Sequence, residues 1–197
     1  AHRNLLHLVT IPASIVPPPS LFPWDHHPNG MIATMSDAPL TGTVALLSDA
    51  PLEELIGVVE VLAQEGVANL SLPVDSASLE ELVALYGQRI RIGVHGAVKA
   101  PATLATQGAD FVLPDFVTPD IATIAEALAL ACYATAMTPT EVATALTMPV
   151  TGVQLRPAEV VGPIMAEHLQ HMGLIDKTIP RGGLIPFTAK QWLSAGA

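Results

Sequence analysis

Residues 153–159 read Val-Gln-Leu-Arg-Pro-Ala-Glu, a short segment with aliphatic residues at alternate positions that reaches a proline. Such a segment is typical of a buried strand that enters a turn. Similar runs recur along the chain, and each is followed by a helical stretch; with this one included they cover residues 43–47, 68–72, 90–94, 110–113, 131–135, 152–155 and 177–179. Seven strand–helix units of about 20 to 25 residues predict parallel strands joined by crossover helices, in a doubly wound sheet or a (β/α)8 barrel.

Two of the expected helices have a clear apolar face. In residues 51–64 and 78–86, leucines and valines recur at intervals of three and four, the spacing of one side of a helix. Asp49 and Ser76 precede these two helices and are expected to cap them, and Pro51 occupies a position that the first helical turn tolerates.

The first 40 residues differ from the rest. Seven prolines there argue against a continuous helix or a central strand, so we expect a proline-rich arm or leader over 1–40 and one barrel domain over 41–197. Met31 and Met35 are each a candidate start of the natural chain. Asp25, His26 and His27 lack the further ligands that a closed metal site needs, and we expect no metal.

Composition excludes several classes of protein. The chain has 197 residues, of which 50% are hydrophobic, enough for the core of one domain. The net charge is −10 with only eight Lys and Arg, which argues against nucleic-acid and anionic-membrane partners. The single cysteine, Cys132, lies in an apolar run and is expected in the core. No apolar stretch reaches the roughly 18 residues of a membrane span, so we expect a cytoplasmic protein.

Five motifs together resemble the family of 2-keto-3-deoxy-6-phosphogluconate (KDPG) and 4-hydroxy-2-oxoglutarate (KHG) aldolases. They follow the family's order: Glu-Gly-Val-Ala-Asn-Leu-Ser at 65–71, Gly-Ala-Asp-Phe-Val-Leu-Pro at 108–114, Thr-Pro-Thr-Glu at 138–141, Arg-Pro-Ala-Glu at 156–159 and Pro-Arg-Gly-Gly-Leu at 180–184. The resemblance implies a homotrimeric (β/α)8 barrel of TIM type, within the α/β class. It also implies class I aldolase chemistry without a cofactor, in which a lysine amine condenses with a keto carbon and a glutamate moves protons.

The positions that the resemblance assigns to this chemistry are replaced. Gln154 stands at the position of the family's lysine, and an amide cannot form an imine. Ser71 stands at the glutamate position, and Asp75 at that of an arginine. Gly96 and Arg181 stand where the family has threonines. The resemblance therefore implies a retained fold with lost or altered catalysis.

No other lysine is expected to supply the amine that position 154 lacks. The chain has Lys99, Lys177 and Lys190; we expect Lys99 and Lys190 on outer helices and Lys177 at the base of the seventh strand. Catalytic groups in such barrels lie at the opposite, C-terminal ends of the strands.

The mouth of the barrel is expected to attract a small anion. Strand alternation directs Arg156 to the same side as Gln154, and Arg181 precedes the pair Gly182 and Gly183, which in the family helps to hold a phosphate. His95, at the end of the third strand, and Asp75 are further candidates. The alternative is that both arginines pair with Asp75, Asp115 or Glu159, three acidic residues in neighbouring turns.

The family's eighth strand has no counterpart before Ala197. The alternatives are a truncated product, an open barrel, or a gap covered by the N-terminal arm or a neighbouring subunit. Two functions remain open: a non-catalytic or altered-function homologue that binds a small anion or keto acid, or a divergent class I aldolase or lyase. The latter would cleave a 2-keto-3-deoxy (phospho)sugar acid to pyruvate and an aldehyde.

Overall fold

The computed structural model describes residues 6–10 and 39–197. Within them, one sheet has eight strands in the order β1 to β8, and the strands from β2 to β8 are parallel to their neighbours. These are β2 Thr43–Leu47, β3 Asn69–Pro73, β4 Arg91–Gly96, β5 Phe111–Pro114, β6 Ala131–Ala136, β7 Gly152–Leu155 and β8 Thr178–Pro180. The seven parallel strands and the α/β class predicted from the sequence are confirmed.

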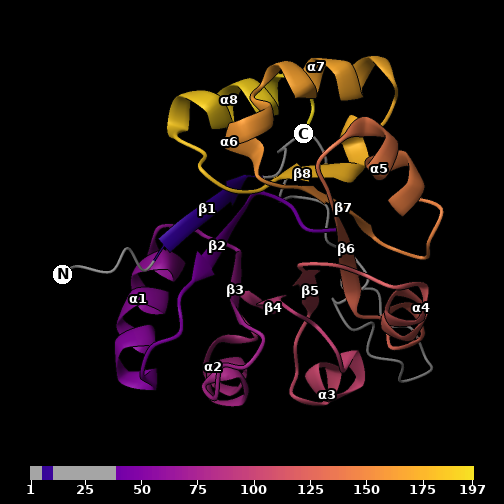
Figure 1. Cartoon of the computed structure of the whole chain (residues 1–197). Coiled ribbons are helices and arrows are strands. Elements are labelled where there is room, and N and C mark those ends of the chain that lie inside the picture. The colour runs from indigo at the N-terminus through magenta and orange to yellow at the C-terminus, as the bar shows by residue number, and fades with distance from the viewer. Residues whose placement is uncertain (1–5, 11–38) are drawn as a thin grey trace, which may run out of the picture.

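A helix follows each strand from β2 to β8, and the helices surround the curled sheet (Figure 1). They are α1 Leu52–Gln64, α2 Leu79–Tyr86, α3 Pro101–Thr106, α4 Pro119–Ala127, α5 Pro139–Ala145, α6 Ala158–Val161, α7 Ile164–His171 and α8 Pro186–Ser194, with a 3-10 turn at Ile175–Lys177. None of the helices in the described ranges is long and apolar enough to cross a membrane.

The predicted caps of the first two helices are wrong. The residues at the N-cap positions are Pro51 for α1 and Ser78 for α2, and neither accepts a side-chain capping bond. Asp49 lies too far before α1 to cap it, and the Ser76 hydroxyl meets the backbone N–H of Ser78, which precedes α2, at 3.4 Å. Side-chain capping occurs instead at α4 and α5, whose N-cap residues are threonines.

Alternation along the strands separates two apolar layers. Odd and even positions of β2 face opposite sides, so that Val44 and Leu46 join the inner cluster while Ala45 and Leu47 pack beneath the helices. The inner cluster consists of Leu40, Val44, Leu46, Phe111, Leu113, Ala131, Tyr133 and Ile179. Cys132 belongs to the outer layer, and burial raises the pKa of its thiol to about 12, as suits a core residue.

Glycines make room for the two inner aromatic rings. A Cβ on Gly93 would lie 2.5 Å from the ring of Phe111 on the next strand, and a Cβ on Gly152 would lie 3.0 Å from the ring of Tyr133. Because each aromatic ring lies against a glycine, which has no side chain, the interior is filled without overpacking.

The eighth position of the sheet is taken by β1, Leu6–Thr10, which the sequence analysis did not predict. It runs antiparallel to β2, with Leu6 opposite Leu47 and Thr10 opposite Thr43, and it also lies beside β8. Of the alternatives considered for the gap, the structure has the N-terminal arm covering it. Asp25, His26, His27, Met31 and Met35 lie outside the described residues.

Candidate functional site

A cavity of about 520 Å³ opens at the C-terminal ends of the strands. Such barrels place their reactive groups at this end. The cavity brings together five of the predicted binding residues, and its lining consists of Leu46, Leu47, Ser48, Asp49, Pro73, His95, Arg156, Pro157, Glu159, Arg181, Gly182 and Gly183. The sixth, Asp75, is exposed in the turn after β3 and is not part of this lining.

Gln154 is buried next to the cavity and contacts Arg181 of its lining. Its side chain is fully buried on β7, and Nε2 donates to the backbone carbonyl oxygens of Pro114 at 2.7 Å and Tyr133 at 3.2 Å. Its Oε1 accepts a 2.7 Å hydrogen bond from Nη1 of Arg181. Because both amide hydrogens and the amide oxygen have partners, this residue links β5, β6 and the end of β8, and it presents no nucleophile.

Arg181 is a buried cation. Only 7% of the residue is exposed, and besides Gln154 its Nη1 reaches the carbonyl oxygen of Leu113 at 3.5 Å. The pKa of Arg181 is lowered to about 10, chiefly by burial and to a smaller extent by the charge of Arg156, while Asp115 opposes the shift. Among the described residues, no carboxylate lies within 4.0 Å of its guanidinium. A buried cation without a counter-ion is costly, so an anion in the cavity would be stabilised there.

Arg156 has a partner at the rim. Its Nη1 forms an ion pair with Oδ1 of Asp115, and the two side chains are 39% and 40% exposed. This is one of the pairings that the sequence left open. Because the pair is solvated, Arg156 contributes less to the field inside the cavity than its formal charge suggests.

The double glycine faces an acidic side chain. Gly182 and Gly183 have φ angles of +99° and +55°, which favour glycine. A Cβ on Gly182 would lie 2.8 Å from Oε2 of Glu159, and one on Gly183 would lie 2.5 Å from the Cβ of Glu159. Helix α8 begins only at Pro186. The structure thus brings a carboxylate to the place where the resemblance implies a phosphate.

Ser71 on β3 and His95 on β4 form a polar pair at the cavity. Oγ of Ser71 lies 2.9 Å from Nδ1 of His95, and Ser71 is fully buried whereas His95 lines the cavity. The sequence analysis named both residues without pairing them. Their contact depends on the register of β3 and β4, in which Ser71 lies opposite Gly93 and Pro73 opposite His95.

The three lysines lie away from the cavity lining. The prediction for Lys99 is wrong in detail, because it lies on the loop between β4 and α3 and not on a helix. Lys177 ends the 3-10 turn before β8 and Lys190 lies on α8, as predicted. All three are exposed.

Asp49 is a lining residue that the sequence analysis assigned to capping. The available signal was its position just after the first parallel strand, since polar residues at that point of a barrel strand face the mouth.

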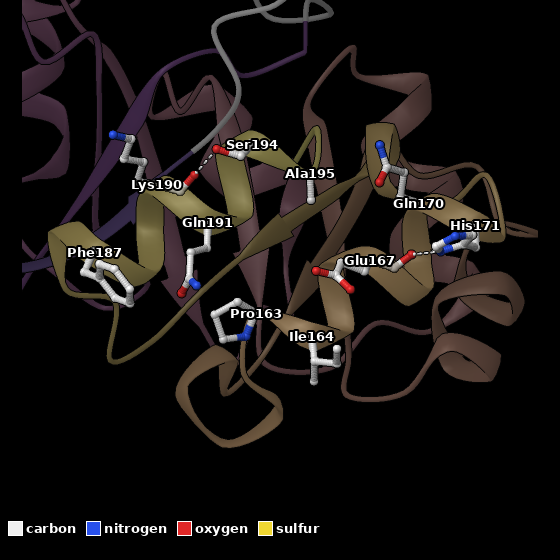
Figure 2. A pocket seen from close by; sticks show the side chains of 10 residues that line it. All are labelled: Pro163, Ile164, Glu167, Gln170, His171, Phe187, Lys190, Gln191, Ser194 and Ala195. Atoms are coloured by element: carbon white, nitrogen blue, oxygen red, sulfur yellow. Dashed lines mark hydrogen bonds between the residues drawn. The ribbon is translucent and has the colours of Figure 1, made fainter.

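A larger groove, of about 860 Å³, lies between α7 and α8 on the outside of the barrel (Figure 2). Its lining is mostly exposed helix surface, and two of its polar side chains bond within their own helices. Nδ1 of His171 meets the carbonyl oxygen of Glu167 at 2.7 Å, and Oγ of Ser194 donates to that of Lys190 at 2.8 Å. No buried charged side chain faces this groove in the described part of the chain. The smaller cavity at the mouth is therefore the better candidate for chemistry.

Comparisons with known proteins agree with this fold. A structure described as native KDPGal has 23% sequence identity and a TM-score of 0.71, over 78% of this chain and 78% of that one. A 4-hydroxy-2-oxoglutarate aldolase/KDPG aldolase has 27% identity and a TM-score of 0.63, over 72% and 73%. The KDPG aldolase from Legionella pneumophila, with pyruvate captured as a covalent carbinolamine, has 18% identity and a TM-score of 0.65, over 76% and 76%.

No curated protein matches the sequence. The family described as KDPG and KHG aldolase matches residues 33–197, which include all seven parallel strands and the cavity at their ends. The chain belongs to the KDPG and KHG aldolase family.

Proposed function

We propose that this protein is an altered-function member of its family, a pseudoenzyme with respect to imine chemistry, which binds a small carboxylate of the 2-keto acid class at the mouth of the barrel. The observation that carries the proposal is the hydrogen bond between Nη1 of Arg181 and Oε1 of Gln154. An amide now occupies the position that the family resemblance assigns to the amine, and it helps to hold a buried guanidinium at the cavity.

The ligand class follows from the charges around the cavity. Arg181 is desolvated and lacks a carboxylate partner among the described residues, so a ligand carboxylate would gain a charge-assisted hydrogen bond of about 1.5–3 kcal/mol. Glu159 and Asp49 also line the cavity and repel a second negative charge. We therefore expect monoanions such as pyruvate to bind in the millimolar to high-micromolar range, and doubly charged phosphate to bind less well.

Binding is tested by titrating pyruvate, phosphate and sulfate at constant ionic strength while the thermal midpoint is measured. We expect pyruvate to raise the midpoint of the wild-type protein and Arg181→Ala to abolish the increase. Glu159→Gln should strengthen anion binding, because it removes a negative charge from the lining and keeps the shape of the side chain. Arg89→Ala, on a surface arginine paired with Glu60, is the matched control. Equal shifts in wild type and Arg181→Ala, or no shift in either, would contradict the proposal.

The non-covalent mode is tested by borohydride reduction in the presence of pyruvate. The protein mass should stay unchanged, because no lysine lines the cavity. A stoichiometric pyruvate adduct would favour the alternative function, a divergent class I aldolase or lyase that uses an amine elsewhere.

We further propose that the protein is a homotrimer in the cytoplasm. Large apolar side chains remain exposed on several helices and loops, among them Phe116, Val160, Ile164, Ile185 and Phe187, and association would bury part of them. A related structure is a cage designed by fusing symmetric oligomeric domains, with 23% identity over 60% of that chain. Sedimentation at micromolar concentration should give a trimer, and a lone 20.5 kDa species would contradict it.

A further inference from the structure

The Ser71 and His95 pair has the geometry of a positioned acid–base group. Both side chains point into the barrel, since residues of adjacent strands at these register positions share a face. Oγ of the buried Ser71 lies 2.9 Å from Nδ1 of His95, and His95 lines the cavity. A hydrogen bond to one ring nitrogen fixes the orientation of the ring and selects its tautomer.

The pair allows Nε2 of His95 either to accept or to donate a proton. When Nδ1–H donates to Oγ of Ser71, Nε2 carries a lone pair and acts as a base. When the Ser71 hydroxyl donates to Nδ1, Nε2 carries the proton and acts as an acid. Ser71 is a positioning residue in both arrangements.

The rest of the cavity supplies an electrophilic environment. Arg181 and Arg156 carry positive charge, and Asp115 pairs with Arg156 at the rim. Asp49, after β2, and Glu159, on α6, are the acidic groups of the lining. A 2-keto acid with its carboxylate on Arg181 would have the adjacent carbonyl oxygen close to the same guanidinium, which would stabilise negative charge that develops there.

We infer that His95, positioned by Ser71, catalyses the enolisation of a 2-keto acid held on Arg181, without a covalent intermediate. The C3–H bond breaks and its proton moves to Nε2 of His95; the electron pair forms the C2=C3 bond, and the carbonyl π pair moves to oxygen. In the reverse step His95 returns a proton that has exchanged with solvent water. No other reactant is needed. The inference rests on the proposed function, because the carboxylate must bind first.

Exchange of the pyruvate methyl protons in D2O, followed by proton NMR, tests the inference. We expect the wild-type protein to accelerate exchange over buffer, and His95→Gln to lower the rate constant by about 10²-fold or more, as is usual for loss of a general acid–base group. Ser71→Ala should lower the rate constant at saturation and leave the pyruvate concentration for half-saturation unchanged. Prior treatment with borohydride and pyruvate should not reduce the activity, because no imine takes part. Arg89→Ala should exchange like the wild type.

The outcomes separate this inference from the proposed function. Pyruvate binding with no exchange above buffer overturns the role of His95 and leaves the binding proposal intact. Absence of binding overturns both. Full exchange in His95→Gln, or in Ser71→Ala should the first variant not fold, also overturns the inference. Exchange that borohydride treatment abolishes would assign the reaction to an imine instead.

Discussion

Nη1 of Arg181 donates a 2.7 Å hydrogen bond to Oε1 of Gln154, so two positions 27 residues apart act as one unit at the mouth of the barrel. The resemblance assigns a lysine to position 154 and a threonine to position 181. A lysine at 154 would place its ammonium beside the guanidinium of Arg181 in a buried site, where the two cations repel and both are desolvated. The glutamine and the arginine are therefore chemically matched.

Gln154→Lys should lower the free energy of unfolding by about 3–5 kcal/mol, because it buries an unpaired charge beside an existing one. The double variant Gln154→Lys/Arg181→Thr should recover much of this loss, since only one cation remains. Urea unfolding of the two single variants and the double variant measures the coupling. If the costs of the single changes simply add, the two residues are not coupled.

The same double variant tests the chemistry. Its lysine is desolvated, and desolvation lowers the pKa of an amine and so favours its nucleophilic form. We expect borohydride and pyruvate to produce a mass increase in the double variant and none in the wild type. Arg181→Thr alone is the control, because it opens the same space without supplying an amine.

Removal of residues 1–10 should destabilise the barrel. Strand β1 pairs along the whole of β2 and lies beside β8, so its loss leaves backbone groups of β2 unpaired and uncovers β8. We expect a lower thermal midpoint and increased light scattering. A variant that lacks only residues 1–5 keeps β1 and should behave like the full chain. Equal stability of the two shortened proteins would show that β1 contributes nothing to the barrel.

Two glycines should respond to alanine in opposite directions. A Cβ at Gly93 would lie 2.5 Å from the backbone oxygen of Phe111, which cannot move without shifting β5; Gly93→Ala should cost about 1–3 kcal/mol. Gly57 lies exposed within α1 with no atom within 4 Å of such a Cβ, and Gly57→Ala should stabilise by about 0.5–1 kcal/mol. Urea midpoints of both variants measure the contrast. A neutral Gly93→Ala would show that the interior is less tightly packed than the distances indicate.

The parallel strands could be predicted because each is a short apolar run with its own boundaries. The predicted bounds of β2 and β7 are those of the structure, and the other five differ by one or two residues. Strand β1 was missed because its run lies in a proline-rich segment and its partner, β2, is more than 30 residues away. Nothing local distinguishes such a strand from an extended arm.

The residues of the candidate site could be predicted from the sequence, but the contacts between them could not. Position at a strand end identified His95, Arg156 and Arg181, and the resemblance identified Gln154 and Ser71. Which side chain meets which depends on the register between strands, as in the pairing of Gln154 with Ile179 that brings Arg181 within reach. Alternation along a strand predicts which face a side chain occupies, but it leaves open which residues of two strands lie opposite each other.

Acid should weaken the start of α5 through Glu141. Its Oε2 accepts hydrogen bonds from the backbone N–H groups of Met137 at 2.8 Å and Thr138 at 2.9 Å, and these bonds hold the pKa of this exposed carboxyl below its usual 4.5. A depressed pKa in the folded state means that the contribution to stability is present above 4.5 and is lost as the pH falls through the folded value.

Glu141→Gln keeps the shape of the side chain and removes its charge, so its urea midpoint should lie below that of the wild type at pH 7, and the difference should shrink toward about pH 3 as the wild-type carboxyl is protonated. Thr118→Ala, which removes the hydroxyl that accepts a hydrogen bond from the backbone N–H of Ile121 at the start of α4, is the matched comparison, because the Thr118 hydroxyl does not titrate in this range. That variant should cost about 1 kcal/mol at both pH values. A difference between wild type and Glu141→Gln that is the same at the two pH values would show that the carboxylate charge does not stabilise the helix.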